Sequence, residues 1–389
     1  MKQKGSNINT IKNENNSLIL NCIRRKAMSR AEISKSTGLS KSAVTIITKQ
    51  LIDEGQLMEI GTESISYGRH PILLDIVKTR RYAMGIALDR ARVTVCIVNL
   101  KLQSVDSRCR DISEFDAPDK AVLWAYQNGL EILDEKKISR ELCVGIGVAA
   151  PGPLDYKRGL ILASPNFELF RDFDVRGCLA AYSDMPVFVN NTPVLMAMYE
   201  HCKREPELNN YIYVTVDNGV GSAIFQNGRV NMGSAGFSGE IGHTTVDVNG
   251  PACSCGNYGC LEGYVTKKAF LKLYGIDYEE NVDKAYSGDR DALDRIVRLA
   301  RCFASGIINA VNMLDLDTVI ISGELNYRYE LLFEQIQNNI NERSIITKAH
   351  KVTVLPALAE NSAFSAVNVI EHYFSAAGLG ADAASHAAI

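Results

Sequence analysis

Three cysteines and one histidine gather in a glycine-rich stretch, residues 239–263 (GEIGHTTVDVNGPACSCGNYGCLEG). His243, Cys253, Cys255 and Cys260 offer one imidazole and three thiolates, the soft ligands that zinc prefers in a tetrahedral arrangement. The glycines between these residues allow a short loop to bring the ligands together. Four protein ligands leave no coordination position open, so the pattern predicts one structural Zn²⁺ per chain rather than a catalytic ion.

The other cysteines and the apolar segments indicate where such a protein works. Seven of the ten cysteines are scattered singly, and a disulfide framework is typical of small secreted domains, so we expect reduced thiols. Residues 1–10 are polar and lack the apolar core of a secretory signal. The longest apolar stretches, such as 142–151, are too short to cross a bilayer. We therefore predict a cytoplasmic protein with no membrane insertion.

A second candidate site lies in the first 80 residues, which are basic. They carry 13 Lys+Arg against 7 Asp+Glu, whereas the remainder carries 29 against 38. A basic head on an acidic body indicates that the head meets a polyanion, although so small an excess decides nothing by itself. The periodicity predicts a first helix over 17–27, with Leu18, Cys22 and Ile23 on one stripe.

Capping residues then mark two further helices. Ser29 and Glu32 form a capping box at the start of the second helix, and Gly38 ends it. Ser40 can cap a third helix that runs to about Glu54. This order of helix, glycine turn and helix is typical of a helix-turn-helix motif.

The third helix has one face suited to the DNA major groove. Val44, Ile47 and Leu51 share its apolar face, whereas short polar side chains, a lysine and a methyl-bearing isoleucine share the opposite face. Such a face can approach base edges and phosphates closely, although a merely solvated face has the same pattern. The residues predicted to contact DNA from this helix are Ser40, Lys41, Ser42, Thr45, Ile46 and Lys49.

Two short strands after the third helix complete the pattern of a winged helix. They are predicted over 57–61 and 72–76, joined by the polar loop TESISYGRHP. Arg69 lies near the tip of this loop, where a guanidinium suits the narrow, electronegative minor groove of A·T-rich DNA. An ordinary surface arginine is the alternative. We predict that residues 1–80 form a winged helix-turn-helix domain that binds double-stranded operator DNA.

From Tyr82 onward, apolar strands alternate with helices, which predicts an α/β architecture. The predicted strands cover 82–88, 92–100, 142–149, 186–190, 211–216, 222–225, 318–322 and 351–356. We assign residues 81–374 to this effector domain. The Ala/Gly-rich end, residues 375–389, is expected to be a flexible tail.

At this point the chain resembles the ROK family of repressors and sugar kinases, specifically its winged-helix repressor branch, from about Ile11 to Phe374. The most specific element is the Glu-x-x-Gly/His…Cys-x-Cys-Gly-x-x-Gly-Cys-x-Glu signature. The resemblance implies an actin-like (sugar-kinase/ribonuclease-H-like) fold of two lobes with a sugar between them. It also implies that sugar hydroxyls are bound by Asn166, Asn191, Glu240, His243 and Glu262. Carboxylates and amides suit paired hydrogen bonds to vicinal hydroxyls.

The chain departs from the family's kinases at four places. The phosphate loop Asp-x-Gly-Gly-Thr is replaced by ALDRA at 87–91, and Asp217 stands where the second loop has glycine. The glycine-rich adenosine contact becomes Ser-Gly-Glu at 322–324. The general base, an aspartate in the kinases, is replaced by Thr192, whose hydroxyl cannot accept a proton as a carboxylate can. We therefore predict no enzymatic activity.

These observations predict a sugar-responsive transcriptional regulator of carbohydrate uptake or catabolism genes, expected to be a repressor. Its effector would be a sugar or a sugar phosphate, and operator symmetry implies a homodimer or a higher homo-oligomer. Two alternatives stay open. One is a residual sugar kinase with a DNA-binding head, and the other is a regulator controlled by a sugar-transport protein instead of a sugar.

Overall fold

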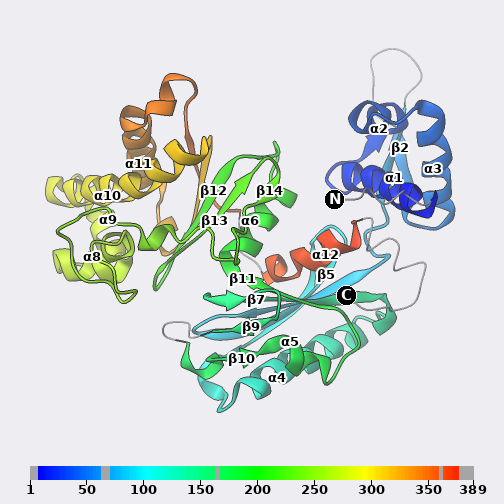
Figure 1. Cartoon of the computed structure of the whole chain (residues 1–389), viewed down its shortest axis with the longest axis horizontal. Coiled ribbons are helices and arrows are strands. Elements are labelled where there is room, and N and C mark those ends of the chain that lie inside the picture. The colour runs from blue at the N-terminus through cyan, green and yellow to red at the C-terminus, as the bar shows by residue number, and fades with distance from the viewer. Residues whose placement is uncertain (1–7, 63–70, 163–166, 359–361, 376–389) are drawn as a thin grey trace. The chain divides into compact units, whose positions relative to one another are not determined.

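The computed structural model describes residues 8–62, 71–162, 167–358 and 362–375, which form two compact units (Figure 1). Unit 1 comprises Met1–Thr192 and Asn361–Ile389, and unit 2 comprises Pro193–Glu360. Arg69, Asn166 and the tail from residue 376 onward lie outside the described residues. None of the helices that the described residues form is long and apolar enough to span a membrane.

Unit 1 begins with three helices and a small antiparallel sheet. The helices are α1 (Ile8–Ile23), α2 (Arg30–Thr37) and α3 (Lys41–Asp53). The sheet has the order β1 (Met28–Ser29), β3 (Ile72–Ile76), β2 (Leu57–Thr62). Both predicted strands are therefore present and pair with each other, whereas the short strand β1 was not predicted.

The predicted helix caps are also present. Glu32 Oε2 accepts a hydrogen bond from Ser29 N at 2.7 Å, and Ser29 Oγ accepts one from Glu32 N at 3.3 Å, which makes the reciprocal capping box. Gly38 ends α2 in the left-handed conformation (φ 73°), and Ser40 Oγ accepts from Ala43 N at the start of α3.

The buried stripe of α1 differs from the prediction. The helix begins at Ile8 and ends at Ile23, so it starts nine residues earlier than expected. Leu18 is 47% exposed, whereas Ile19, Leu20 and Ile23 are buried. The face of α1 that packs on its neighbours therefore differs from the face that the periodicity predicted.

Helix α3 also buries a residue that its periodicity did not select. Val44 and Leu51 are buried as predicted, but Thr48 is fully buried beside them and Ile47 is only half-buried. The Thr48 hydroxyl has partners there, because its Oγ1 accepts from Arg30 Nε at 3.1 Å and donates to the Thr45 carbonyl at 3.3 Å. A hydroxyl with hydrogen-bond partners can be buried at modest cost.

The rest of unit 1 is built on a five-stranded mixed sheet. Its strand order is β11-β7-β4-β5-β6, in which β4, β5 and β6 are antiparallel and β7 and β11 run parallel to β4. The strands are β4 (Tyr82–Leu88), β5 (Arg92–Asn99), β6 (Ser104–Asp111), β7 (Cys143–Ala150) and β11 (Val187–Asn191). A second, three-stranded sheet has β8 (Leu154–Asp155), β9 (Leu160–Ile161) and β10 (Phe173–Asp174).

Helices cover both faces of the five-stranded sheet. On one face α4 (Pro118–Glu135) and α5 (Val175–Ala180) complete a hydrophobic core. The other face is covered by the turn Ser362–Ala366 and by α12 (Val367–Tyr373). A Cβ at Gly147 would lie 2.1 Å from the Ser365 carbonyl oxygen, so only glycine permits this close approach.

Helix α1 contacts the end of α12 through a stripe of polar side chains. Ser17 Oγ and Asn21 Nδ2 both donate to the Phe374 carbonyl oxygen, at 2.6 and 3.1 Å. Arg24 Nη2 lies 2.6 Å from Glu371 Oε1, and its guanidinium lies 5.3 Å from the centre of the Phe374 ring. Carbonyl groups at a helix C-terminus have no partner within the helix, so α1 supplies donors that α12 lacks.

Unit 2 is built on a second five-stranded sheet of order β14-β13-β12-β15-β16. Its strands are β12 (Tyr211–Val216), β13 (Val220–Gln226), β14 (Arg229–Val230), β15 (Thr318–Gly323) and β16 (Thr353–Pro356). The main helices are α6 (Thr192–Lys203), α7 (Glu262–Val265), α8 (Lys267–Tyr274), α9 (Tyr278–Tyr286), α10 (Arg290–Leu314) and α11 (Glu330–Arg343). The core lies between one face of the sheet and α10 with α11, and α6 packs on the other face.

Strands alternate with helices through both units, which confirms the predicted α/β architecture. The predicted strands of the body are all present, and their bounds differ from the prediction by at most two residues.

Candidate functional site

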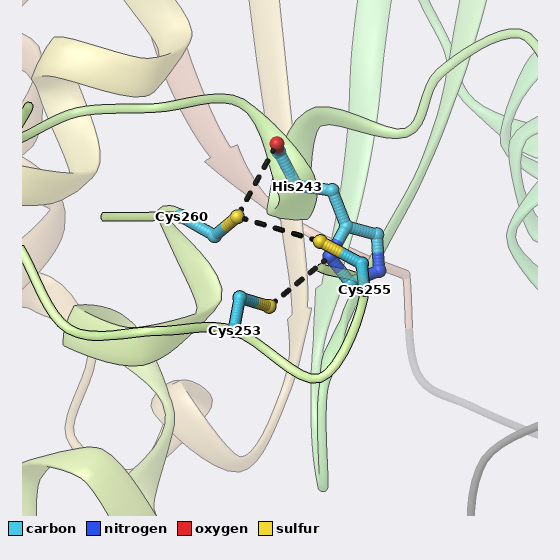
Figure 2. A group of neighbouring side chains, drawn as sticks. All are labelled: His243, Cys253, Cys255 and Cys260. Atoms are coloured by element: carbon cyan, nitrogen blue, oxygen red, sulfur yellow. Dashed lines mark hydrogen bonds between the residues drawn. The ribbon is translucent and has the colours of Figure 1, made fainter. Parts of the chain in front are cut away.

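The predicted metal ligands lie together in unit 2. Figure 2 shows the sulfurs of Cys253, Cys255 and Cys260 and the ring of His243 pointing toward one another. One ligand atom from each residue lies within 4.8 Å of every other, so the group could hold a metal ion. Cys255 Sγ is 3.7 Å from Cys260 Sγ, and Cys253 Sγ is 3.7 Å from His243 Nδ1.

These spacings fit a tetrahedral zinc site. Zn–S and Zn–N bonds of about 2.3 and 2.0 Å make the edges of a tetrahedron about 3.8 Å for two sulfurs and about 3.5 Å for sulfur and nitrogen. The Cys255–Cys260 and Cys253–His243 pairs, at 3.7 Å each, lie within about 0.2 Å of these edges. No pair is wider than 4.8 Å, so the remaining pairs need at most a small contraction. Three thiols and one imidazole are also the donor set of known structural zinc sites.

The loop that carries the ligands needs glycine at its sharpest points. Gly256 and Gly259 have φ of 92° and 61°, and a Cβ at Gly259 would lie 1.7 Å from the Asp247 carbonyl oxygen. Asn257, which the sequence did not single out, donates from Nδ2 to the His243 carbonyl oxygen at 3.3 Å and to Thr245 Oγ1 at 3.0 Å. It thereby holds the histidine segment against the cysteine loop.

The cysteines differ in their electrostatic surroundings. Burial raises the pKa of the Cys260 thiol to about 12, and the neighbouring Cys253 and Cys255 sulfurs act in the same direction. At Cys255, a hydrogen bond from the Asn257 backbone lowers the pKa of the exposed thiol. A metal ion requires thiolates, so binding displaces the proton that Cys260 otherwise retains.

Glu240 and Glu262, two of the predicted effector-binding residues, belong to unit 2 as well. Glu262 is half-buried at the start of α7, and its Oε2 accepts a hydrogen bond from Val220 N at 2.9 Å. Glu240 keeps contact with solvent, but desolvation by the surrounding protein still raises its pKa. The charge of Glu262 acts in the same direction, while His243 opposes it, so the three groups lie near one another.

The predicted effector residue Asn191 and the threonine after it lie in unit 1. Asn191 ends β11, and a Cβ at Gly152 would lie 2.9 Å from its Nδ2, so the amide lies against the Pro-Gly-Pro segment that follows β7. Thr192 begins α6 and is half-buried.

The predicted DNA-binding face of α3 is exposed. Ile46 is 69% exposed, and Ser40, Lys41, Ser42, Thr45 and Lys49 are exposed with it. The three hydroxyls of this face already have partners: Ser40 caps the helix and its Oγ lies 3.0 Å from Ser42 Oγ, and Thr45 Oγ1 donates to the Lys41 carbonyl at 2.8 Å. The Thr45 hydroxyl oxygen, which only donates here, keeps its lone pairs for a further partner.

The sequence pattern of the ROK family matches residues 84–367, well over half of the chain. The chain belongs to the ROK family.

Two proteins named as repressors are similar to the chain over nearly its whole length. It is 28% identical over 373 residues to the xylose repressor of Bacillus subtilis, which covers 93% of this chain and 96% of the repressor. It is 27% identical over 359 residues to the N-acetylglucosamine repressor of Shigella flexneri, which covers 87% of each chain.

Two solved structures have the same fold. A ROK family transcriptional regulator, described as a homolog of the Escherichia coli MLC protein, has a TM-score of 0.78 at 24% identity and covers 95% of this chain and 98% of its own. The ROK hexokinase of Thermus thermophilus has a TM-score of 0.66 at 23% identity and covers 78% of this chain and 99% of its own. The chain therefore has the actin-like fold of ROK sugar kinases and a segment that the hexokinase lacks.

Proposed function

We propose that the chain is a sugar-responsive transcriptional repressor of carbohydrate uptake or catabolism genes. The observation that carries the proposal is its likeness, over nearly the full length of both proteins, to relatives named as repressors. The two relatives are named for different sugars, so the family alone does not decide which sugar acts on this chain.

Residues 1–80 would act as a winged helix-turn-helix domain on operator DNA. The three helices, the β2–β3 hairpin and the exposed face of α3 support this role. Short polar side chains and Ile46 would meet base edges, and Lys49 a phosphate. Arg69 is proposed to reach the minor groove. A segment that the hexokinase lacks, in a chain similar to repressors throughout, agrees with an added DNA-binding domain.

Residues 81–374 would form the effector domain and hold one structural Zn²⁺. His243, Cys253, Cys255 and Cys260 would hold the ion, and a bound Zn²⁺ would fix the loop before α7 without taking part in chemistry. The effector sugar would be bound by Asn166, Asn191, Glu240, His243 and Glu262.

Phosphoryl transfer is not expected. At the position of the kinase base, Thr192 offers a hydroxyl that cannot accept a proton at neutral pH. The first phosphate loop is replaced by a hairpin whose Asp89 Oδ1 accepts from the backbone N–H groups of Ala91 and Arg92 at 2.5 and 3.2 Å. Turnover of ATP that depends on a sugar would instead favour a residual kinase.

The contacts between α1 and α12 support regulation of the DNA-binding domain (residues 1–80) by the effector domain (residues 81–374). A change in the sheet on which α12 packs would reach the DNA-binding helices through Ser17, Asn21 and Arg24. In a homodimer, the spacing of two heads decides whether both reach successive major grooves, about 34 Å apart. A small change in the contacts between α1 and α12 would therefore change the affinity for the operator.

DNA binding is tested by fluorescence polarisation with a duplex from the region upstream of the gene and a scrambled duplex. The Lys49→Ala variant should bind the upstream duplex more weakly and reduce the slope of log affinity against log salt by about 1, because one phosphate contact is lost. Lys272→Ala, which removes an exposed helical lysine of unit 2, is the matched control and should leave the slope unchanged. Equal affinity of wild-type protein for both duplexes would contradict the repressor assignment.

A further inference from the structure

Two carboxylates flank the tight turn that joins β12 to β13. Asp217 N donates to the Gly219 carbonyl at 2.9 Å, and Asp217 Oδ2 accepts from Thr215 Oγ1 at 3.0 Å. On the other side of the turn, Glu262 Oε2 accepts from Val220 N, and a Cβ at Gly219 would lie 2.6 Å from this oxygen. The backbone N–H groups of Asp217 and Val220 in this turn therefore already have acceptors, and two negative side chains lie beside them.

The negative charge extends from this turn to the end of β15. A Cβ at Gly323 would lie 2.6 Å from Asp217 Oδ1, so the carboxylate lies against the residue that precedes Glu324. Burial raises the pKa of Glu324, and the charge of Asp217 adds to this shift while Lys267 opposes it. Lys267 offsets little of this negative charge, because its Nζ lies 2.5 Å from Glu279 Oε1 and already forms an ion pair with that carboxylate.

The metal cluster adds no positive charge to this region. Glu240 lies three residues before the predicted ligand His243, and the negative charge of Glu262 contributes to its raised pKa. A divalent ion held by three thiolates and a neutral imidazole leaves one net negative charge. A ligand that contacts Glu240 and Glu262 therefore meets hydrogen-bond acceptors and negative charge.

The β4–β5 hairpin of unit 1 is built in the same way. Asp89 Oδ1 accepts from Ala91 N and Arg92 N, and Asp89 N donates to the Arg92 carbonyl at 3.1 Å. Here again a carboxylate accepts from backbone N–H groups of a turn that ends a central strand. In both turns a carboxylate therefore occupies backbone donors of the kind that bind phosphate, and adds negative charge beside them.

We propose that the effector is an uncharged sugar and that its phosphate ester is excluded by the carboxylates at the β12–β13 turn. This inference rests on the proposed function, because it concerns the ligand of the same site. Sugar hydroxyls donate hydrogen bonds, which the carboxylates of Glu240 and Glu262 accept. A phosphate ester is close to a dianion at neutral pH and offers only acceptors and negative charge, so it is repelled.

The test is isothermal titration calorimetry of the full-length protein with a panel of neutral aldopentoses and aldohexoses, each paired with its terminal phosphate ester. One neutral sugar should bind, and its ester should bind at least tenfold more weakly. Raising the ionic strength should narrow this difference, since salt screens the repulsion. The Asp217→Asn variant should also narrow it by raising the affinity for the ester, whereas Asp294→Asn, an exposed aspartate of α10, should leave it unchanged.

The outcomes distinguish a failure of the proposed exclusion of the phosphate ester from a failure of the proposed sugar-responsive function. Tighter binding of an ester than of its parent sugar by the wild-type protein would overturn the inference while leaving a sugar-responsive repressor intact. An unchanged difference in Asp217→Asn would show that this turn does not exclude the ester and would also overturn the inference. Binding of neither form by any member of the panel would refute the sugar effector itself.

Discussion

Removal of the metal should loosen the loop between His243 and Cys260, and the cost can be worked from its length. The proposed ion closes a segment of about 18 residues, and a cross-link that closes such a loop contributes about 3 kcal/mol in the chain-entropy treatment. This value is an upper limit, because hydrogen bonds such as Val246 N to the Gly259 carbonyl (2.8 Å) and Leu261 N to the Thr244 carbonyl (3.0 Å) remain without the ion.

The same estimate gives the expected change in melting temperature. For a unit of this size, 1 kcal/mol corresponds to about 2–4 °C, so chelation should lower the melting temperature of unit 2 by up to about 12 °C. The fully buried Leu261 follows the last ligand, and a Cβ at Gly306 would lie 2.7 Å from it, so loosening of the loop also reaches α10. We therefore expect removal of the metal to loosen the packing of Leu261 against α10 as well, and so to lower the melting temperature of unit 2.

The assay combines colorimetric measurement of released zinc with thermal unfolding, with and without a chelator. The Cys255→Ser variant should be purified with less than one zinc per chain and should melt at the temperature of the chelated protein. Cys109→Ser replaces another exposed cysteine, in β6 of unit 1, and should retain the metal and the melting temperature. A wild-type protein without zinc, or one whose melting is unaffected by its removal, would refute the assignment of a structural metal.

Two further predictions concern unit 1. Arg24→Ala should lower the free energy of unfolding in urea by about 1–2 kcal/mol, because it removes a partly buried ion pair with Glu371 and a cation–π contact. Arg110→Ala is the control, since it removes a similar but more exposed ion pair with Glu114 and a cation–π contact. An equal loss of stability in Arg110→Ala would contradict the role of burial. Burial lowers the pKa of His372, whose ring lies 5.0 Å from that of Phe188, so the unfolded chain binds more protons between this lowered pKa and about 6.5. Stability should therefore rise with pH through that interval and level off above it, and His372→Gln should flatten the slope; the same slope in both proteins would exclude His372 as its source.

Features encoded by neighbouring residues were predictable from the sequence. The capping box at Ser29 and Glu32 and the cap at Ser40 depend on contacts within four residues, and all are present. The predicted metal ligands, from His243 to Cys260, also lie close in the sequence, and the structure brings them together. Because their geometry is set by a short loop, the pattern and spacing of residue types were enough to predict that they gather.

Features set by distant partners were not predictable. Burial of Thr48 instead of Ile47 depends on Arg30, which comes from another helix, and exposure of Leu18 depends on which face of α1 its neighbours cover. The bond from Val220 N to Glu262 joins residues 42 positions apart. No local pattern reports such a contact, so the position of Glu262 beside the β12–β13 turn became visible only in the structure.

The central claim is that a sugar controls DNA binding, and the most direct test is a fluorescence-polarisation titration of the full-length protein on its upstream duplex, repeated with each sugar of the panel. We predict that one sugar changes the dissociation constant for the duplex by at least tenfold, a coupling of about 1.4 kcal/mol. Tight, specific binding to the duplex that no sugar alters would contradict the claim and would direct attention to a sugar-transport protein as the regulator.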